Sequence, residues 1–149
     1  MLGLPFETRE TYFKTVELNR KADVQVPQIG FFFPFEKTKL RETAIENGFY
    51  DPKNEQIYDP DKPALHFKSL SEQDLKILRK RFVLYVKLPK DFWPFIERSE
   101  KTDEIGRALE KRLFEIYNTC VFEHDGWYND EGKLEKYLSE LKTIVGEKA

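Results

Sequence analysis

Hydrophobic residues recur at helical spacing along much of the chain, with polar residues at the positions between them. The most regular of these stripes holds Leu75, Leu78, Phe82 and Tyr85, and a stripe of this kind is typical of a helix that buries one face. The pattern predicts helices over residues 8–21, 37–47, 71–88, 103–121 and 134–145.

The segments on either side of the first predicted helix have a different pattern. Leu2 precedes a turn that contains Gly3 and Pro5, and the segment Val24–Phe35 is rich in β-branched and aromatic residues. The three successive phenylalanines Phe31–Phe33 need cover on both faces, which is typical of a parallel strand. We therefore expect a βαβ unit whose first strand has only two or three residues, so that a parallel sheet is cut at this point.

These patterns divide the chain into three regions and predict an α/β or α+β fold class. Residues 1–48 hold the βαβ unit, which ends at Gly48. Residues 49–70 form a proline-rich connecting loop, with a short strand predicted at Ala64–Phe67. Residues 71–149 form a mainly helical region.

The composition excludes several classes of protein. Acidic and basic residues are mixed along the chain and give a net charge of −2, whereas a nucleic-acid-binding surface needs an excess of Lys and Arg on one face. No segment approaches the roughly 20 apolar residues that span a bilayer, and the N-terminus lacks the basic and apolar regions of a secretion signal. We expect a cytoplasmic protein that binds neither nucleic acid nor membrane.

Cysteine and histidine are too few for a metal site built on them. Cys120 and His124 are four residues apart, and His66 is the only other histidine, while a zinc site needs three or four ligands. Cys120 also continues an apolar stripe, which predicts a buried structural cysteine rather than a metal ligand or a nucleophile. His66 lies between Leu65 and Phe67, and no partner residue can be named for it.

Three further groups each have a structural and a functional interpretation. The carboxylates of the connecting loop lack the central glycine of an EF-hand, so we interpret them as solvated. The cations of the 71–88 helix mostly avoid its apolar stripe, which favours a solvated face over a phosphate site. Trp93 and the pair Trp127-Tyr128 fit core packing, which we favour, or a ligand or protein contact. The carboxylates are Asp51, Glu55, Asp59 and Asp61, and the cations are Lys76, Arg79, Lys80, Arg81 and Lys87.

The turn from Gly3 to Thr8 has two interpretations of about equal weight. A glycine and a proline between a strand and a helix make a tight turn, and Thr8 is a suitable N-cap residue. The carboxyl end of a parallel strand is also where α/β barrels carry their active sites. There Glu7 could accept hydrogen bonds from loop N–H groups or position a ligand.

Several motifs, in their order along the chain, resemble a known family. Gly3-Leu4-Pro5-x-Glu7-Thr8, a helix, and a phenylalanine-rich strand running into Pro34-Phe35-x-x-Thr38-x-Leu40 are similar to the closing strands of the radical S-adenosylmethionine (radical SAM) barrel. The later order is an Asn47-Gly48 helix end, a proline-rich acidic loop and Leu70-Ser71-x-x-Asp74-Leu75. This order is similar to the C-terminal region of members that carry an N-terminal cobalamin-binding domain. The resemblance covers about residues 1–90.

The resemblance implies the fold and the cofactors of a parent enzyme. Residues 1–48 would be the last βαβ unit of a partial, TIM-like α/β barrel, and a Cys-x-x-x-Cys-x-x-Cys loop elsewhere would bind a 4Fe-4S cluster. The cluster would cleave S-adenosylmethionine to a 5′-deoxyadenosyl radical, and cobalamin would be a further cofactor of the parent. By the same resemblance, Gly3, Pro5 and Glu7 shape the adenosine pocket, and Phe33 and Pro34 lie beside the adenine.

Two positions depart from the family pattern. Phe6 stands where such relatives usually have glycine, and Glu36-Lys37 stands where they usually have Pro-Gly. With a single cysteine this chain cannot hold the cluster. We therefore expect neither radical chemistry nor firm cofactor binding from this chain alone, and assign it no catalytic or metal-binding residue.

Two functions are consistent with these observations. The first is that of a C-terminal fragment of a cobalamin-type radical SAM enzyme, whose partner is the missing N-terminal half of the barrel from the same gene or a neighbouring chain. The second is that of a non-enzymatic interaction module that packs on a partner supplying the missing strands. Neither indicates a small-molecule substrate. In both, Phe31–Phe33 lacks cover, so the isolated chain should self-associate or bind apolar dyes.

Overall fold

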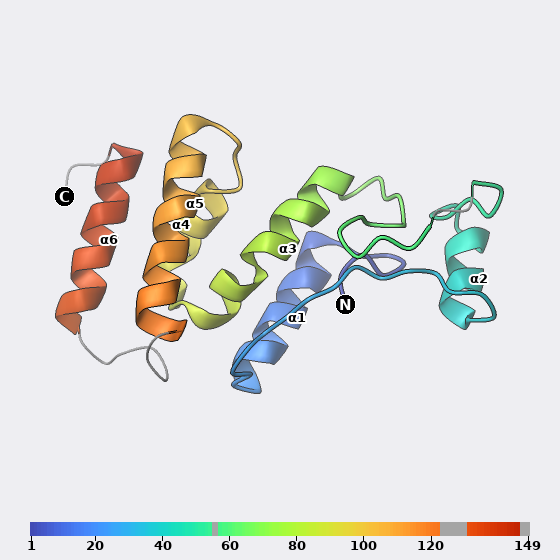
Figure 1. Cartoon of the computed structure of the whole chain (residues 1–149), viewed down its shortest axis with the longest axis horizontal. Helices are drawn as coiled ribbons and strands as arrows, with labels where there is room; N and C mark the ends of the chain where they lie inside the picture. Colours follow the sequence, from blue (N-terminus) through green and yellow to red (C-terminus); the bar gives the residue numbers. More distant parts are fainter. Residues whose placement is uncertain (55–56, 123–130, 147–149) are drawn as a thin grey trace. The chain divides into compact units, whose positions relative to one another are not determined.

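Helices make up the regular secondary structure of this computed structural model, which describes residues 1–54, 57–122 and 131–146 (Figure 1). The helices are α1 (Arg9–Lys21), α2 (Lys39–Glu46), α3 (Glu72–Lys87), α4 (Trp93–Arg98), α5 (Glu104–Tyr117) and α6 (Glu131–Val145). A 3₁₀ turn η1 (Lys90–Phe92) precedes α4, and a π-helical turn η2 (Asn118–Phe122) follows α5. The chain forms two compact units, Met1–Phe82 and Val83–Ala149, which are described separately.

The predicted α/β fold class is wrong, because the described ranges contain no β-strand and no sheet. Leu2 and Phe31 form an isolated parallel bridge. In it the Leu2 N–H donates to the Gly30 carbonyl at 2.9 Å, and the Phe32 N–H donates to the Leu2 carbonyl at 2.8 Å. The βαβ portion of a partial barrel that was predicted for residues 1–48 is therefore absent, and a single bridge joins the segments before and after α1. The strand predicted for residues 64–67 is absent as well.

The backbone explains why the phenylalanine-rich segment does not extend this bridge into a strand. Pro27 and Pro34 have no N–H to donate to a ladder. Beyond the bridge the Phe35 N–H donates to the Phe33 carbonyl at 3.0 Å, which turns the chain away. Lys37 then has a φ of 62°, in the left-handed region. Two extended segments without further strands beside them are only marginally stable.

In the first unit, α1 is held at its start and along one face. The Thr8 side chain accepts a hydrogen bond from the Thr11 N–H in a capping box, which confirms the predicted N-cap. The buried Tyr12 donates its hydroxyl hydrogen to the Leu78 carbonyl of α3 at 2.9 Å, and its ring contacts that of Phe82 at 6.1 Å. Packing of α1 on α3 thus covers Leu78 and Phe82 of the stripe that the sequence pattern predicted.

The start of α3 is the sequence feature that the structure reproduces most closely. The Ser71 N–H donates to Asp74 Oδ2 at 2.8 Å, and the Asp74 N–H donates back to Ser71 Oγ at 3.1 Å. This reciprocal capping box satisfies two N–H groups at the helix terminus. Leu70 and Leu75, on either side of this capping box, are both buried.

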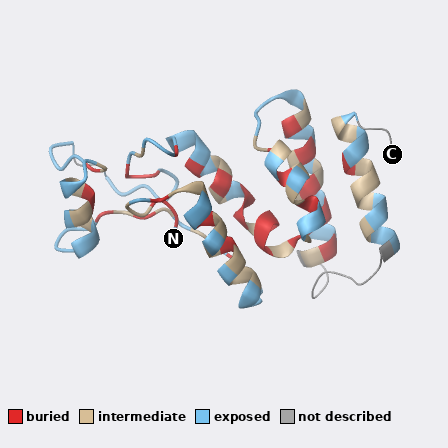
Figure 2. Cartoon of the chain, turned by 180° about the vertical axis from the view of Figure 1, so that it is seen from behind, coloured by how far each residue is buried: buried red, intermediate tan, exposed pale blue. Residues whose placement is uncertain are grey.

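The second unit packs its helices through leucine and isoleucine residues. Leu109, Leu113 and Ile116 of α5 and Leu141 of α6 are buried. Figure 2 draws buried stretches of the helices in red. Trp93 packs its ring edge-on against Tyr85 at 5.4 Å, which confirms the packing interpretation for this residue. The predicted turn around residues 125–130, with Trp127-Tyr128, lies outside the described residues, as do Glu55 and His124.

The N-terminus of α5 is the tightest junction in the second unit. Asp103 accepts the Gly106 N–H on Oδ1 at 2.7 Å and binds the Arg98 guanidinium at 3.0 and 2.9 Å. These hydrogen bonds, from Arg98 first and then Gly106, lower the pKa of the Asp103 carboxyl. A Cβ at position 106 would collide with the backbone carbonyl of Lys101, so the site admits only glycine.

We predict that Gly106→Ala destabilises the chain, although alanine favours a helix by up to about 1 kcal/mol over glycine. The collision with the Lys101 carbonyl should outweigh that gain and cost about 1–3 kcal/mol, the usual range for overpacking. Urea unfolding of the full chain measures the loss, and Lys111→Ala at an exposed position of α5 is the matched control. A Gly106→Ala chain as stable as the control would contradict this packing.

Candidate functional site

The bridge between Leu2 and Phe31 brings the two segments with the predicted site residues together. Gly3, Pro5 and Glu7 lie in the turn that follows Leu2, and Phe33 and Pro34 follow Phe31 by two and three residues. The parallel direction of the bridge matches the direction that the sequence predicted for these two segments. The site residues therefore belong to one region of the first unit.

Two of the five predicted residues are covered by the protein itself. Gly3 is buried, and a Cβ there would lie 4.0 Å from Leu75 Cδ1. Its φ of 78° suits glycine in a tight turn. Pro34 is buried as well, and its carbonyl accepts a hydrogen bond from Arg41 Nη1 at 2.9 Å. Both residues therefore have a structural role in the turn or the core.

Glu7 lies at the centre of the turn and is only 6% exposed. Its Oε1 accepts a hydrogen bond from Thr11 Oγ1 at 2.6 Å, and its carbonyl accepts one from Ser69 Oγ at 3.2 Å. The carboxylate thus binds the first turn of α1 instead of the loop N–H groups considered from the sequence. These two hydrogen bonds tie the turn to α1 and to the segment before α3.

A pocket of about 500 Å³ opens beside Glu7. Its apolar wall is built from three phenylalanine rings in series, with Phe6 against Phe49 at 5.2 Å and Phe49 against Phe67 at 5.4 Å. The remaining lining is polar and comes from Glu7, Thr8, Asn47, Gly48, His66, Lys68 and Ser69. An apolar wall with a few polar groups is the usual composition of a site for a small organic ligand.

The geometry assigns His66 to the rim of this pocket. Its side chain is exposed, and its backbone N–H donates to the Phe49 carbonyl at 2.9 Å. Of the five predicted site residues, this pocket is lined by Glu7 and by none of the other four. The sequence missed the pocket because its wall comes from three separate segments, at Phe6, Phe49 and Phe67.

Phe6 has an unusual backbone conformation at the mouth of the pocket. Its φ is 66°, in the left-handed region that glycine adopts without strain, and its side chain is largely exposed. A side chain costs about 1–2 kcal/mol in this conformation. The departure from a family glycine noted at this position therefore carries a backbone cost.

The cations and carboxylates near α3 differ in part from the predicted solvated face. Lys76 and Lys80 are exposed, and Arg79 binds Asp61 at 2.8 Å and lies over the Phe31 ring at 4.9 Å. Arg81 is only 4% exposed, so the prediction of a solvated side chain is wrong for it. Its Nη1 donates to the Ile77 carbonyl of the same helix at 3.4 Å.

In the second unit, a polar cluster joins α5 and η2 to α6. Arg112 binds Glu140 at 2.5 Å and Glu115 at 3.0 Å, and its guanidinium lies over the Tyr137 ring at 5.5 Å. A hydrogen bond with Cys120, aided by burial, raises the pKa of the Tyr137 hydroxyl. Cys120 is buried, which confirms its predicted burial. This cluster could not be predicted from the sequence, because it depends on how α6 packs against α5.

Known proteins provide no relative for this chain, since no family model, curated protein or solved structure matches it. Among the described side chains, no three of His, Cys, Asp or Glu gather to hold a metal ion. No helix in the same part of the chain is long and apolar enough to cross a membrane. The resemblance to radical SAM enzymes, and the roles it implies for the five residues, stay predictions.

We predict that Phe6→Gly gives a more stable chain than Phe6→Ala. Both variants lose the contact with Phe49, so they differ only by a Cβ in the left-handed conformation. That Cβ should cost about 1 kcal/mol despite the lower unfolded-state entropy of alanine. Chemical unfolding of the two variants side by side measures the difference. A more stable Phe6→Ala would contradict the positive φ.

Proposed function

We propose that this chain is a non-catalytic part of a cobalamin-type radical SAM enzyme and binds the cluster-bearing part of that enzyme through the backbone of Phe31. The order of the motifs between Gly3 and Leu75 supports the assignment to this family. The single cysteine supports a non-catalytic role, because a 4Fe-4S cluster needs several thiolates. The bridge at Phe31 carries the proposal.

The bridge leaves its backbone open on the Phe31 side. In a parallel pair, successive residues direct their N–H and C=O groups to opposite sides. Gly30 and Phe32 bond to Leu2, so the N–H and C=O of Phe31 point the other way. Neither group has a hydrogen-bond partner within the described ranges. An open edge of this kind is a template for an added extended segment.

Exposed aromatic residues follow this edge along the chain. The Phe33 ring lies 5.0 Å from that of Phe35 and 5.4 Å from that of Tyr58. Phe35 and Tyr58 are 58% and 54% exposed although both are large apolar rings. We call Phe33, Phe35 and Tyr58 the aromatic cluster. A segment added at Phe31 would gain apolar contacts there as well as backbone hydrogen bonds.

The residues of this chain are not suited to bind the cofactors of the parent enzyme. The cluster does not fit, since the one cysteine is buried beside Tyr137 in the second unit. The turn is also occupied by its own side chains, since the Glu7 carboxylate already accepts a hydrogen bond from Thr11. In this proposal the turn takes part in no chemical step, and the cofactors bind to the cluster-bearing part.

The open edge also supports a second function, that of an interaction module with a partner unrelated to radical SAM enzymes. The backbone of Phe31 and the aromatic cluster serve that function equally well. The adjoining coding sequence separates the two. A Cys-x-x-x-Cys-x-x-Cys motif encoded in frame before this chain, or by the neighbouring gene, supports the first function, and its absence supports the second.

We predict that Phe31→Pro abolishes binding to the polypeptide that carries this three-cysteine motif, whereas Phe31→Ala only weakens it. Proline removes the outward N–H but leaves the bonds of Leu2 to Gly30 and Phe32 intact, and alanine removes only the ring. Co-expression with that polypeptide, followed by co-purification, measures the binding of each variant.

Formation of 5′-deoxyadenosine from S-adenosylmethionine under reducing, anaerobic conditions is the second measurement. The co-purified pair should be active, and this chain reconstituted alone should be inactive. Activity of the chain alone would disprove the non-catalytic role. Equal binding by Phe31→Pro and Phe31→Ala would disprove binding through the backbone.

A further inference from the structure

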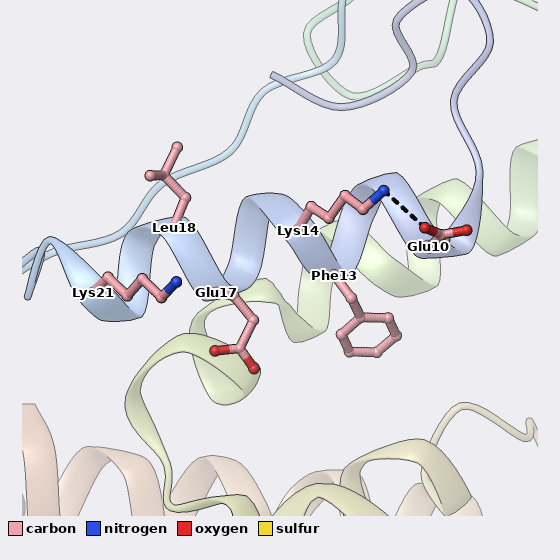
Figure 3. Close-up of a pocket in the computed structure, with 6 residues that line it drawn as sticks. All are labelled: Glu10, Phe13, Lys14, Glu17, Leu18 and Lys21. Carbon is pink, nitrogen blue, oxygen red and sulfur yellow. Dashed lines mark ion pairs between the residues drawn. The ribbon is translucent and has the colours of Figure 1, made fainter.

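Helix α1 presents a shallow groove of about 560 Å³ on a face that does not pack on α3 (Figure 3). Leu18, in the last turn of the helix, is 66% exposed on this face. The exposed Glu10 and Lys14 form an ion pair of 2.7 Å within the helix. The groove is lined by Glu10, Phe13, Lys14, Glu17, Leu18 and Lys21, which we call the α1 face.

The charges of the α1 face are arranged symmetrically with opposite sign about the middle of the helix. Glu10 and Lys21 are equally far from the midpoint between Thr15 and Val16, and so are Lys14 and Glu17. Reversing the direction of the helix therefore places each acid where a base was. A surface with this property is complementary to itself about a twofold axis.

We propose that the α1 face binds the α1 face of a second copy of this chain, with the two helices antiparallel. The twofold axis passes the midpoint of each helix and sets Glu10 against Lys21 of the second copy. The same axis sets Lys14 against Glu17 of the second copy. Symmetry repeats both pairs, so four ion pairs cross the interface.

The apolar residues lie on the two flanks of this line of charges. Figure 3 shows Phe13 and Leu18 pointing to opposite sides of α1. The twofold axis therefore sets Phe13 beside its own copy on one flank and Leu18 beside its own copy on the other. Each such pair is offset by five residues along the helix, roughly 7.5 Å, which large side chains can span. Dimerisation thus covers Leu18.

Charge complementarity selects a second copy in this orientation over other occupants. A parallel pair would set Glu10 against Glu10 and Lys21 against Lys21, and a uniformly acidic or basic partner would meet like charges at half of the positions. The intrahelical pair of Glu10 and Lys14 does not prevent the rearrangement, because exposed pairs contribute little. Glu17 and Phe13 also have interactions within their own chain, which the contacts with the second copy must replace.

The interface should be weak and sensitive to salt. A helix of 13 residues is about 20 Å long, so the paired helices bury less than the roughly 800 Å² per partner of a standard stable interface. Ion pairs at an exposed interface are screened as the ionic strength rises. We expect a dimer that forms at high micromolar concentrations and dissociates when salt is added.

Sedimentation velocity of the full chain over a concentration series tests the proposal. Two variants are used, an acidic one with Lys14→Glu and Lys21→Glu and a basic one with Glu10→Lys and Glu17→Lys. Each alone should dimerise at least about tenfold more weakly than the natural chain, since like charges then oppose each other. An equimolar mixture of the two should recover a heterodimer.

Circular dichroism of each variant checks that α1 is retained, and Phe31→Pro is the control for association through the open edge. That variant should dimerise like the natural chain. A natural chain that stays monomeric into the millimolar range would overturn the proposal, and so would a mixture that stays monomeric while both variants are folded. Dimerisation unaffected by the charge reversals, or lost in Phe31→Pro, would assign association to the open edge instead.

Discussion

The parallel bridge between Leu2 and the Phe31 segment determines how the first unit is built. Two backbone hydrogen bonds hold the segment before α1 beside the segment after it. The chain must therefore return to Leu2 after the helix ends. The turn at Glu7 and the packing of Tyr12 on α3 follow from that return. The aromatic pocket lies next to the same turn, because Phe6 is held there in the left-handed conformation. Little of this local geometry would survive without the bridge.

Local signals in the sequence predicted five of the described α-helices, missed the short α4 and did not determine the pairing of strands. Thr8, Ser71 and Asp74 cap helices through contacts three residues away, so the sequence contains all the information that their prediction needs. A strand is different, because its stability comes from neighbours far away in the chain. Phe31–Phe33 has the composition of a buried strand, and among the described residues only Leu2 pairs with it. The α/β prediction failed for that reason.

The candidate site divides in the same way. The sequence placed Gly3, Pro5 and Glu7 together because they share one turn, and the structure keeps them there with Glu7 bonded to Thr11. The wall of the pocket could not be predicted, since Phe49 and Phe67 reach Phe6 only through the path of a long proline-rich segment. The cluster of Arg112, Glu140 and Tyr137 required knowledge of how α6 packs on α5.

Arg79 has a consequence for the solubility of the chain. Its guanidinium lies over the ring of Phe31, beside the backbone edge that Phe31 leaves open next to the bridge, and its partner Asp61 is on the exposed loop. Open edges promote fibril growth unless a charge makes indiscriminate pairing costly, and natural proteins use lysine or arginine for this purpose. A strand that pairs here must displace or desolvate a cation, which a dedicated partner can compensate and a chance encounter cannot. Arg79 thus places a cation where indiscriminate pairing at this edge would begin.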